Sequence, residues 1–430
     1  MKRNNNKEEL ITVLGAGVTG LATASFLLDE GYNVKVYEKE VAGGMCVSLK
    51  EDNYIIDLGP HKIYSQIPGI MDYFRELLGD DCLVIKKSNS LRLLGDYYKF
   101  PPQLKQLINP TLIKTGIGVG FSYFLEKLKF RKTVSYEDYL VKGFGRKGYN
   151  LLFGGYAEKV WGDPKQLDKE LAQKRMPISD ILSLVKNILV GVKDNPDVSA
   201  DYFYYPKYGM QQLIDKLVER IQSKGGEICY EKPVLTDKII STIPLPDLLN
   251  LLNAPQEIKD SAEKLEYGPL TLVYVFLNQD RALKDNWIFF PEKEFIFNRV
   301  SEQKSFSRDT VPDGKTVITA EVTALNVDKN DVCDDLFKAG LINKEGVEDV
   351  KVLEFKNVYP LYKIGYKKHL DKVLDYLDSK NIISIGRKGL FNYSNMDHCI
   401  DMALYASKSI GDTPLWKESR KIFDNYRIVD

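Results

Sequence analysis

The fold of this chain is decided near its start, by the stretch Leu10-Ile-Thr-Val-Leu-Gly-Ala-Gly-Val-Thr-Gly-Leu-Ala-Thr-Ala24. Its first five residues are typical of a buried parallel strand, and its last part continues as an alanine-rich helix up to Glu30. The glycines between strand and helix have the spacing G-x-G-x-x-G. We expect Gly15 to allow the tight turn, Gly17 to let the backbone approach a pyrophosphate, and Gly20 to let helix and strand pack closely.

A second strand is expected at Asn33–Tyr37, and it ends at Glu38. In a strand–helix–strand unit of this kind, an acidic residue at this place meets the ribose hydroxyl groups of adenosine. The pyrophosphate would lie at the positive end of the helix, against N–H groups that have no partner within the helix. The stretch therefore predicts a Rossmann-type dinucleotide-binding domain. The alternative is the same turn in a domain that binds no nucleotide.

A pair of glycines favours FAD over NAD as the dinucleotide. Gly43, Gly44 and Met45 follow shortly after Glu38. They resemble the second glycine motif of the large FAD family that includes amine oxidases, protoporphyrinogen oxidase and UDP-galactopyranose mutase. The resemblance implies that these three residues contact FAD. A turn at the protein surface would explain the pair equally well.

The composition indicates a globular protein of more than one domain. The chain has 430 residues, more than a single core usually holds. Lys plus Arg and Asp plus Glu number 60 each, so no overall basic field is present to attract nucleic acid. Five scattered cysteines and three dispersed histidines predict neither a disulfide framework nor a metal site. This use of cysteine is typical of the reduced cytoplasm, where we expect the protein.

No apolar stretch is long enough to predict a membrane span. The nearest candidate is Ile113–Leu128, which Lys114, three glycines and Glu126 interrupt. We predict that this segment packs between domains, and contact with a membrane surface or a partner is the alternative. The first nine residues are polar and lack the apolar core of a signal peptide.

The nucleotide-binding domain is expected to be discontinuous. Lys238–Pro244 is a predicted strand, and Asn381–Gly386 is another that ends in a glycine turn. We therefore predict an α/β fold of the GR2 type, in which a Rossmann-type FAD-binding domain carries an inserted α+β substrate domain. The predicted FAD-binding domain comprises residues 1–80, 222–250 and 378–430, and the substrate domain residues 81–221 and 251–377. In the substrate domain, residues 101–195 are expected to be helical and residues 268–358 to form an antiparallel sheet.

A histidine follows the predicted strand Asn53–Leu58. The turn Gly59-Pro60-His61 stands at the carboxyl end of this strand. Ligands of open α/β sheets bind outside such ends. His61 is therefore a candidate catalytic residue facing the flavin, and a hydrogen-bonded structural histidine is the alternative.

Four further stretches narrow the family. Gly155-Tyr-Ala-Glu-Lys-Val-Trp-Gly162 resembles the mobile-loop region of UDP-galactopyranose mutase. So do Lys174-Arg-Met-Pro177, the residues from Asn298 to Phe306, and the residues from Gly386 to Asp397. The similarity runs nearly end to end and in the same order. A broader group of flavoproteins, called protoporphyrinogen-oxidase-like or polysaccharide-biosynthesis amine oxidases, shares the Glu-Lys-Val-Trp-Gly run. The motifs are thus more specific for this branch than for a substrate.

The resemblance implies roles for several charged residues. Arg175 and Arg299 resemble the two arginines that grip the diphosphate of the sugar nucleotide, a task that suits the guanidinium group. An ordinary salt bridge is the alternative for each of them. Gly386, Arg387 and Met396 are expected beside the FAD, with Arg387 at its pyrophosphate.

Aromatic residues receive roles in the same way. Tyr156 and Trp161 resemble the aromatic part of the loop that closes over the nucleotide, and Tyr359 and Tyr393 resemble the phosphate-binding tyrosines. Because the chain has 26 tyrosines, ordinary packing is the alternative. Asn395 stands where the mutase has an acidic residue beside the phosphates. The segment at residues 202–208 does not match the uridine-binding stretch, so the nucleotide and the sugar stay open.

By this resemblance, the expected function is that of a flavin-dependent nucleotide-sugar mutase. It would convert UDP-galactopyranose to UDP-galactofuranose, or a close relative of these, for cell-surface polysaccharide. Reduced FAD would be the nucleophile, no net electrons would move, and the arginines would stabilise the departing diphosphate. The alternatives are an FAD-dependent oxidoreductase of the amine-oxidase type and a non-catalytic FAD-binding protein. The expected partners are a UDP-linked sugar and, in a homodimer, a second copy of the chain.

Overall fold

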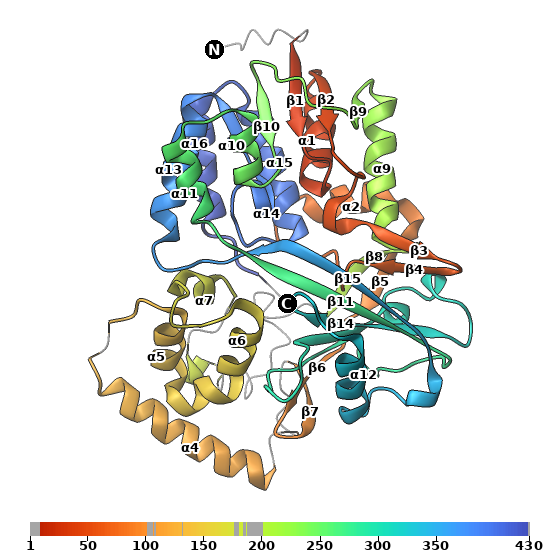
Figure 1. Ribbon diagram of the computed structural model, residues 1–430, viewed down its shortest axis with the longest axis vertical. Helices are drawn as coiled ribbons and strands as arrows, with labels where there is room; N and C mark the ends of the chain where they lie inside the picture. The colour runs from red at the N-terminus through yellow and green to blue at the C-terminus, as the bar shows by residue number, and fades with distance from the viewer. Residues whose placement is uncertain are drawn as a thin grey trace.

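The computed structural model describes residues 9–100, 106, 109–130, 132–175, 180–183, 186 and 201–428. Figure 1 shows a layer around a parallel sheet at the top, and below it a second sheet beside a group of helices. The polar start of the chain, Met176 and Pro177, and parts of the region predicted to be helical lie outside the described residues.

The upper layer is a five-stranded parallel sheet in the order β16-β10-β1-β2-β9. The central strand β1 is the apolar run that opens the nucleotide motif, and its residues Ile11 and Val13 are fully buried. The fold class expected from the sequence is confirmed, because strands from the beginning, middle and end of the chain meet in this sheet. Its strands are β1 (Leu10–Leu14), β2 (Asn33–Tyr37), β9 (Glu227–Cys229), β10 (Ile239–Ser241) and β16 (Ile382–Ser384).

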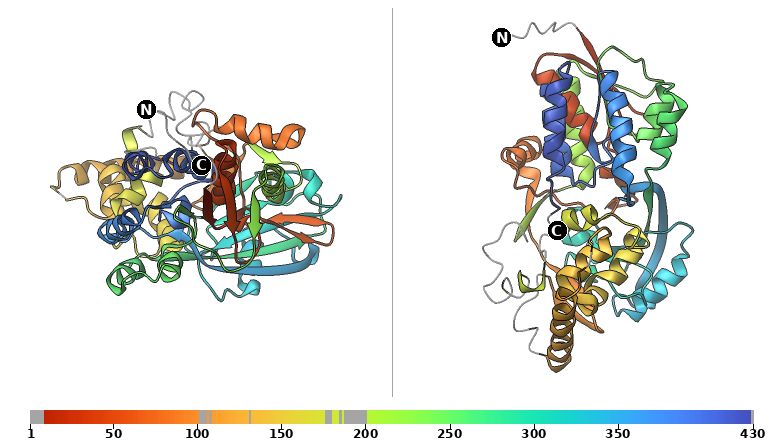
Figure 2. Two further views of the ribbon diagram at one scale, coloured as in Figure 1. Left: turned by 90° about the horizontal axis from the view of Figure 1, so that it is seen from above. Right: turned by 90° about the vertical axis from the view of Figure 1, so that its left-hand side faces the viewer.

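Helices cover both sides of the parallel sheet (Figure 2). The helix of the nucleotide motif, α1, packs between α9 and α15, and α13 packs against α11 and β16. Three of these helices, α9, α11 and α13, lie mostly in ranges that we predicted for the substrate domain, whose boundaries stay a prediction. The helices of this layer are α1 (Val18–Asp29), α2 (Ile70–Leu78), α9 (Met210–Ser223), α10 (Leu245–Leu251), α11 (Gln256–Glu263), α13 (Tyr366–Ser379), α14 (Gly386–Gly389), α15 (Met396–Ser409) and α16 (Thr413–Phe423).

The lower layer contains a seven-stranded sheet in the order β15-β11-β14-β13-β12-β6-β7. Neighbouring strands are antiparallel except β12 and β6. The long strands β11 and β15 cross the molecule between the two layers, and α12 (Lys329–Lys338) lies against this sheet (Figure 1). The strands are β6 (Asn89–Leu93), β7 (Asp96–Lys99), β11 (Tyr267–Leu277), β12 (Trp287–Phe289), β13 (Arg299–Glu302), β14 (Thr316–Val322) and β15 (Val347–Pro360).

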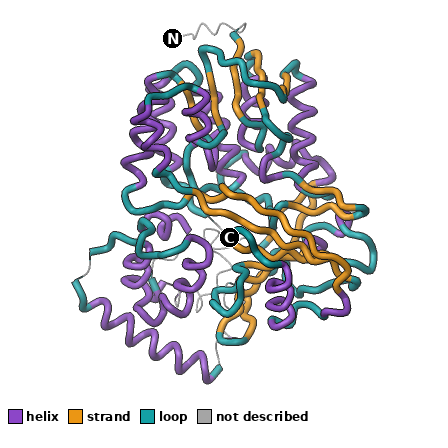
Figure 3. Tube along the Cα trace, viewed as in Figure 1, coloured by secondary structure: helices purple, strands orange, loops and turns teal. Residues whose placement is uncertain are grey.

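A group of helices stands beside this sheet (Figure 3). Its members are α4 (Pro110–Lys127), α5 (Tyr136–Tyr149), the π-helical turn η3 (Asn150–Gly154), α6 (Gly155–Trp161) and α7 (Lys169–Arg175). Helix α5 begins at a capping box, in which Ser135 and Asp138 bond each other's backbone N–H groups. Two further pairs of antiparallel strands join the layers, β3 (Ser48–Glu51) with β4 (Tyr54–Asp57) and β5 (Cys82–Lys86) with β8 (Tyr202–Pro206).

One expected strand is shorter than the sequence indicates. The run Phe295–Val300 predicts a strand, but β13 begins only at Arg299. In the part of the run before Arg299, the carbonyl oxygens of Phe295 and Phe297 accept hydrogen bonds from the ammonium group of Lys159. These carbonyl groups are therefore not available to a neighbouring strand. In the described part of the chain, no helix combines the length and apolar character needed to cross a membrane. The same part holds no cluster of three His, Cys, Asp or Glu side chains suited to a metal ion.

Candidate functional site

A cavity of about 490 Å³ lies at the junction of the two layers. Its walls contain residues that follow strands of the parallel sheet, including Met45 and Arg387, and residues of the lower sheet, including Arg299. Ten residues singled out from the sequence line it together. They are Met45, His61, Tyr156, Arg175, Arg299, Tyr359, Arg387, Tyr393, Asn395 and Met396.

The glycine motif forms the turn that the sequence predicts. Gly15 has a φ of 94°, in the left-handed region that disfavours other residues. A Cβ atom on Gly20 would lie 1.9 Å from the carbonyl oxygen of Gly15, so helix and turn approach each other too closely for any side chain. The carboxylate of Glu38 accepts the backbone N–H of Ala16 at 2.9 Å, which places it beside the same turn.

The second glycine pair lies against the first motif. The N–H of Gly43 donates to the carbonyl of Ala16 at 2.7 Å, and a Cβ atom on Gly44 would lie 3.4 Å from the Cα of Gly17. Gly386, the first residue of α14, approaches the side chain of Thr19 in the first turn of α1. A Cβ atom on Gly17 would meet no other atom within 4 Å. Space is therefore open at the N-terminus of α1, where a pyrophosphate group fits.

Arg299 forms a two-pronged ion pair with Glu321 on the neighbouring strand β14. Its Nη2 donates to Oε2 of Glu321 at 2.9 Å, and its Nε donates to Oε1. Glu321 is 3% exposed, and the register of β13 and β14 places the two residues directly opposite each other. Burial opposes the charge of Arg299, but the carboxylate outweighs burial and raises the pKa of the guanidinium further. The pair fixes Arg299 as a permanent cation in the cavity wall.

Two other arginines lie against aromatic rings. The guanidinium carbon of Arg175, at the end of α7, is 5.5 Å from the ring centre of Tyr393 and 5.7 Å from that of Trp161. Arg387 donates from Nε and Nη2 to the carbonyl of Ser394 and lies 5.4 Å from the ring centre of Tyr359. Both geometries are those of cation–π contacts.

The tyrosines of the cavity are stacked. The rings of Tyr359 and Tyr393 are 5.6 Å apart with an angle of 14° between them, and Trp161 meets Tyr393 edge-on at 6.4 Å. Burial raises the pKa of Tyr359 to about 12, so its phenol keeps its proton. Trp161 itself is buried behind Tyr156 and does not line the cavity. In this structure it supports the aromatic wall from behind.

His61 lies in the cavity as a neutral imidazole. Its Nδ1 is 3.2 Å from the carbonyl oxygen of Gly59. Burial lowers the pKa of His61 to about 4, and Arg387 and Arg299 act in the same direction. Asn395 is the N-cap residue of α15, and its backbone N–H donates to Nδ1 of His398 at 3.1 Å.

Lys159 supports the cavity wall from outside. Its ammonium group donates to the carbonyl oxygens of Glu292 at 2.9 Å and Phe297 at 2.8 Å, and also to those of Phe290 and Phe295. Burial lowers the pKa of Lys159 to about 7, and Glu292 and Asp335 oppose this shift. Lys159 thereby ties α6, which carries Tyr156, to the loop between β12 and β13.

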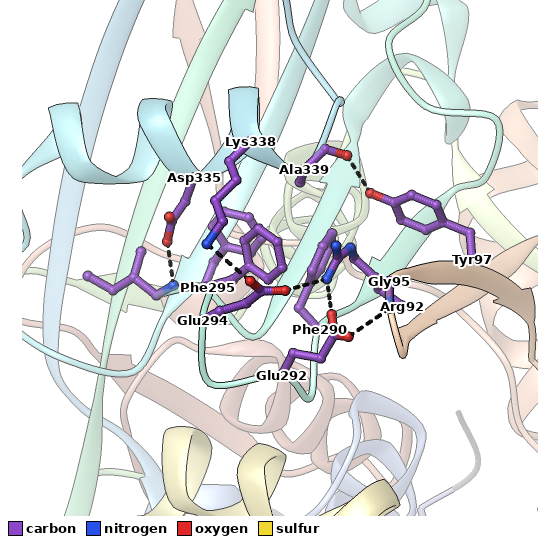
Figure 4. A network of polar contacts seen from close by, with 12 residues as sticks. Arg92, Gly95, Tyr97, Phe290, Glu292, Glu294, Phe295, Asp335, Lys338 and Ala339 are labelled. Atoms are coloured by element: carbon purple, nitrogen blue, oxygen red, sulfur yellow. Dashed lines mark hydrogen bonds and ion pairs between the residues drawn. The ribbon is translucent and has the colours of Figure 1, made fainter. Parts of the chain in front are cut away.

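Ion pairs hold the same loop from its other side (Figure 4). Arg92 contacts Glu292 and Glu294, and Lys338 contacts Glu294 at 3.1 Å. The backbone N–H of Ile296 donates to Asp335 at 2.7 Å. The loop from 290 to 297 is therefore fixed by α6, β6 and α12 together.

The sequence analysis missed Glu321 and Lys159. Glu321 stands within the apolar run Thr316–Val322, and a carboxylate in a buried strand requires a partner, which was the available signal. Lys159 was noticed only as part of a motif. Among the residues that the structure describes, five basic and two acidic ones line the cavity, namely Lys62, Arg175, Arg299, Arg387 and Arg427 against Glu321 and Asp397.

Comparisons with known structures agree with the fold. A family model described as an NAD(P)-binding Rossmann-like domain matches residues 13–77. A crystal structure of reduced UDP-galactopyranose mutase is similar with a TM-score of 0.82 and 20% identity, over 97% of this chain and 99% of that one. A putative protoporphyrinogen oxidase from Exiguobacterium sp. 255-15 is similar with a TM-score of 0.70 and 15% identity, over 94% and 98%. At these identities the likeness establishes the fold alone.

Curated relatives point in two directions. A probable UDP-galactopyranose mutase of Klebsiella pneumoniae is 22% identical over 447 residues, 97% of this chain and 98% of the relative. A 4,4'-diapophytoene desaturase of Staphylococcus haemolyticus (strain JCSC1435) is 26% identical over 244 residues, 51% of this chain. That match covers 47% of the desaturase, so the chain spans about half of its length.

A third relative is a protein of 35% identity over 97 residues, described as an uncharacterized protein in the nifH2 3' region of Methanothermococcus thermolithotrophicus. The match covers 23% of this chain and 89% of that protein. The two chains belong to one family, and the description of the relative states no activity.

Proposed function

We propose that this chain, which has the fold of the UDP-galactopyranose mutase-like flavoproteins, is a flavin-dependent nucleotide-sugar mutase. Its proposed reaction converts UDP-galactopyranose to UDP-galactofuranose, or a close relative of these, for cell-surface polysaccharide. The observation that carries the proposal is the cavity itself. It gathers Arg175, Arg299 and Arg387 around the stacked rings of Tyr359 and Tyr393. A diphosphate attached to a sugar suits such a set of cations and rings.

The proposed cofactor is FAD. The open space before Gly17 and the carboxylate of Glu38 would hold its pyrophosphate and ribose, and Gly43, Gly386 and Arg387 stand around them. Reduced FAD would supply the nucleophile towards the anomeric carbon, which gives an isomerisation without net transfer of electrons.

The residues of the chain would bind and neutralise the leaving group. Arg175 and Arg299 would stabilise the charge that develops on the diphosphate, and Glu321 would keep the guanidinium of Arg299 in place. The wall of Tyr156, Trp161 and Tyr393 would exclude water from the reacting sugar. His61 would act as a neutral polar contact, because its lowered pKa leaves it uncharged at neutral pH.

An FAD-dependent oxidoreductase is the second candidate, and the similarity to the desaturase supports it. An apolar polyene would fit a cavity lined mainly by apolar side chains. The excess of basic over acidic residues in this cavity favours an anionic substrate instead.

One assay tests the proposal. The purified protein, loaded with FAD, is incubated with UDP-galactopyranose with and without dithionite, and the nucleotide sugars are separated by chromatography. We expect a new UDP-hexose peak in the reduced sample only. A reduced, FAD-containing sample without such a peak would reject this mutase reaction.

A pair of arginine variants provides the control. Arg175→Met should lower turnover by about 100-fold, as expected when a charge that stabilises the transition state is removed. Arg308→Met removes an exposed arginine outside the cavity and should leave turnover unchanged. Equal loss in both variants would contradict the role of Arg175.

A further inference from the structure

Helix α4 turns an apolar stripe towards the outside of the protein. Ile113, Ile117, Phe121, Phe124 and Leu128 follow one another at spacings of four, four, three and four residues, which places them on one side of a helix. The side chains of Ile117, Phe121, Phe124 and Leu128 are 71%, 64%, 60% and 69% exposed. Figures 1 and 2 show α4 at the lower edge of the molecule, as the outermost element of the helical group.

The opposite side of α4 is the side that packs. Val119, Ser122 and Glu126 are buried, and the hydroxyl of Ser122 accepts the backbone N–H of Lys147 at 3.1 Å. A Cβ atom on Gly145 of α5 would lie 2.4 Å from the backbone nitrogen of Tyr123, so the two helices touch at their backbones. Tight contact on the polar side fixes the apolar stripe in its outward orientation. Helix α4 therefore packs on α5 of the same helical group, and packing between domains stays a prediction.

The charges around the stripe are almost all positive. Residues 109–134 contain five basic side chains and one acidic one, although the whole chain has 60 of each sign. The single acid, Glu126, is buried and pairs with Lys129 at 2.8 Å. Lys114 and Lys127 are exposed and flank the stripe on its two sides, and Lys132 follows the helix. A second copy of this surface would meet it with like charges, which disfavours self-association.

We propose that α4 is an interfacial anchor for an anionic lipid bilayer. The helix would lie in the plane of the membrane surface, with Phe121 and Phe124 at the level of the upper acyl chains. Lys114 and Lys127 would extend their apolar stems along the stripe and bring their ammonium groups to the lipid phosphates. This surface lies apart from the residues that line the cavity, so the proposal does not depend on the proposed mutase activity.

Flotation of the full chain with lipid vesicles tests the proposal. One set of vesicles is phosphatidylcholine, and the other is an equal mixture of phosphatidylcholine and phosphatidylglycerol. We expect the anionic vesicles to bind at least about tenfold more tightly, and added salt to weaken the binding. Phe121→Glu/Phe124→Glu should abolish binding, and Lys114→Gln/Lys127→Gln should remove the preference for anionic lipid.

Phe337→Glu is the matched control, because Phe337 is half exposed on α12, far from the stripe in sequence. It should bind vesicles like the unmodified chain, and circular dichroism should show the same melting temperature for all variants. Absence of binding to anionic vesicles would overturn the proposal. So would a dimer in lipid-free solution that Phe121→Glu/Phe124→Glu dissociates, because the stripe would then serve a second copy.

Discussion

The pair of Arg299 and Glu321 joins an interaction that stabilises the fold to the proposed binding of a diphosphate. The carboxylate uses the Nε and Nη2 donors of the guanidinium, while the group keeps its charge beside the cavity. Removing one partner of a buried ion pair leaves the other without compensation, which costs more than the pair contributes. A single substitution at Arg299 would therefore lower activity in two ways, by destabilising the fold and by removing a positive charge from the cavity.

A double variant separates these effects. We expect Arg299→Ala to lower the free energy of unfolding by about 3 kcal/mol, because Glu321 is left buried and charged. Arg299→Ala/Glu321→Gln should recover most of this loss, yet it should not recover binding of UDP. Urea unfolding and titration with UDP measure the two quantities. Recovery of UDP binding in the double variant would contradict a direct role of Arg299.

His61 gives a prediction about pH. Burial holds its pKa at about 4 in the folded protein, with Arg387 and Arg299 adding to the effect, so the unfolded chain takes up a proton first as the pH falls through 6.5. This group therefore destabilises the fold progressively below pH 6.5. Since the ring is partly exposed to the cavity, we expect about 1–2 kcal/mol between pH 7 and pH 5. His61→Gln should remove that dependence in urea unfolding.

The comparison must be made between His61→Gln and the unmodified chain at each pH. Asp57 acts in the opposite direction, because burial raises its pKa to about 6 against the hydrogen bonds from Ser48, Tyr205 and Met210. The folded protein then takes up a proton at Asp57 before the unfolded chain does, which favours the fold as the pH falls. Identical pH profiles for His61→Gln and the unmodified chain would show that the imidazole is not held neutral by its surroundings.

At the scale of elements, Lys159 joins α6 to the loop between β12 and β13, beside an exposed ion pair of Glu158 with Lys293. The carbonyl oxygens that accept from Lys159 come from the loop between β12 and β13. Lys159→Met would leave these buried acceptors without their donor. We expect a loss of about 2–3 kcal/mol in the free energy of unfolding, measured with urea. UDP affinity should fall as well, because α6 carries Tyr156.

Lys142→Met is the control for this prediction. Lys142 is exposed on α5, so the same substitution removes a charge without leaving a buried acceptor. Its unfolding curve should match that of the unmodified chain. A loss at Lys159→Met no larger than that of Lys142→Met would mean that the loop is held by its other contacts, which include those of Arg92, Lys338 and Asp335.

Strands whose apolar pattern lies within their own segment were predicted from the sequence. The bounds of β1 and β2 agree with the expectation to the residue, because each is a short apolar run that ends at a glycine or an acid. The run Phe295–Val300 misled the prediction, because its apolar alternation is overruled by Lys159, which is far away in the sequence. Strand β15 lies mostly within the range 268–358 predicted to form a sheet, but its bounds were not predicted, because it lies at a sheet edge and alternates with charged residues.

The same distinction holds for the candidate site. Family motifs, and for His61 its place after a predicted strand, singled out ten residues that the fold brings to one cavity, and their roles stay predictions. The partner of Arg299 and the stacking of Tyr359 on Tyr393 arise from the pairing of strands and from contact between the two layers. No spacing within one segment contains that information. The outward stripe of α4 was visible as an apolar run, but its direction required the packing on α5.

At the scale of the whole molecule, the cavity lies at the junction of the two layers. Arg387 and Met396 come from the upper layer, Arg299 and Tyr359 from the lower sheet, and Arg175 from the helical group. A ligand that contacts all three parts would hold them together. Binding to the folded state alone raises the free energy of unfolding with ligand concentration.

We therefore expect UDP to raise the melting temperature of the FAD-loaded protein. The rise should grow with the ratio of the UDP concentration to its dissociation constant. At about 100 times the dissociation constant the stabilisation is about 2.7 kcal/mol. Arg175→Met should lose most of the shift, because it removes the contribution of the helical group while both sheets stay intact. Arg308→Met, outside the cavity, should keep the full shift. If Arg175→Met retained the full shift in differential scanning calorimetry, UDP would bind without the helical group, and the expected contact of the ligand with all three parts of the fold would be wrong.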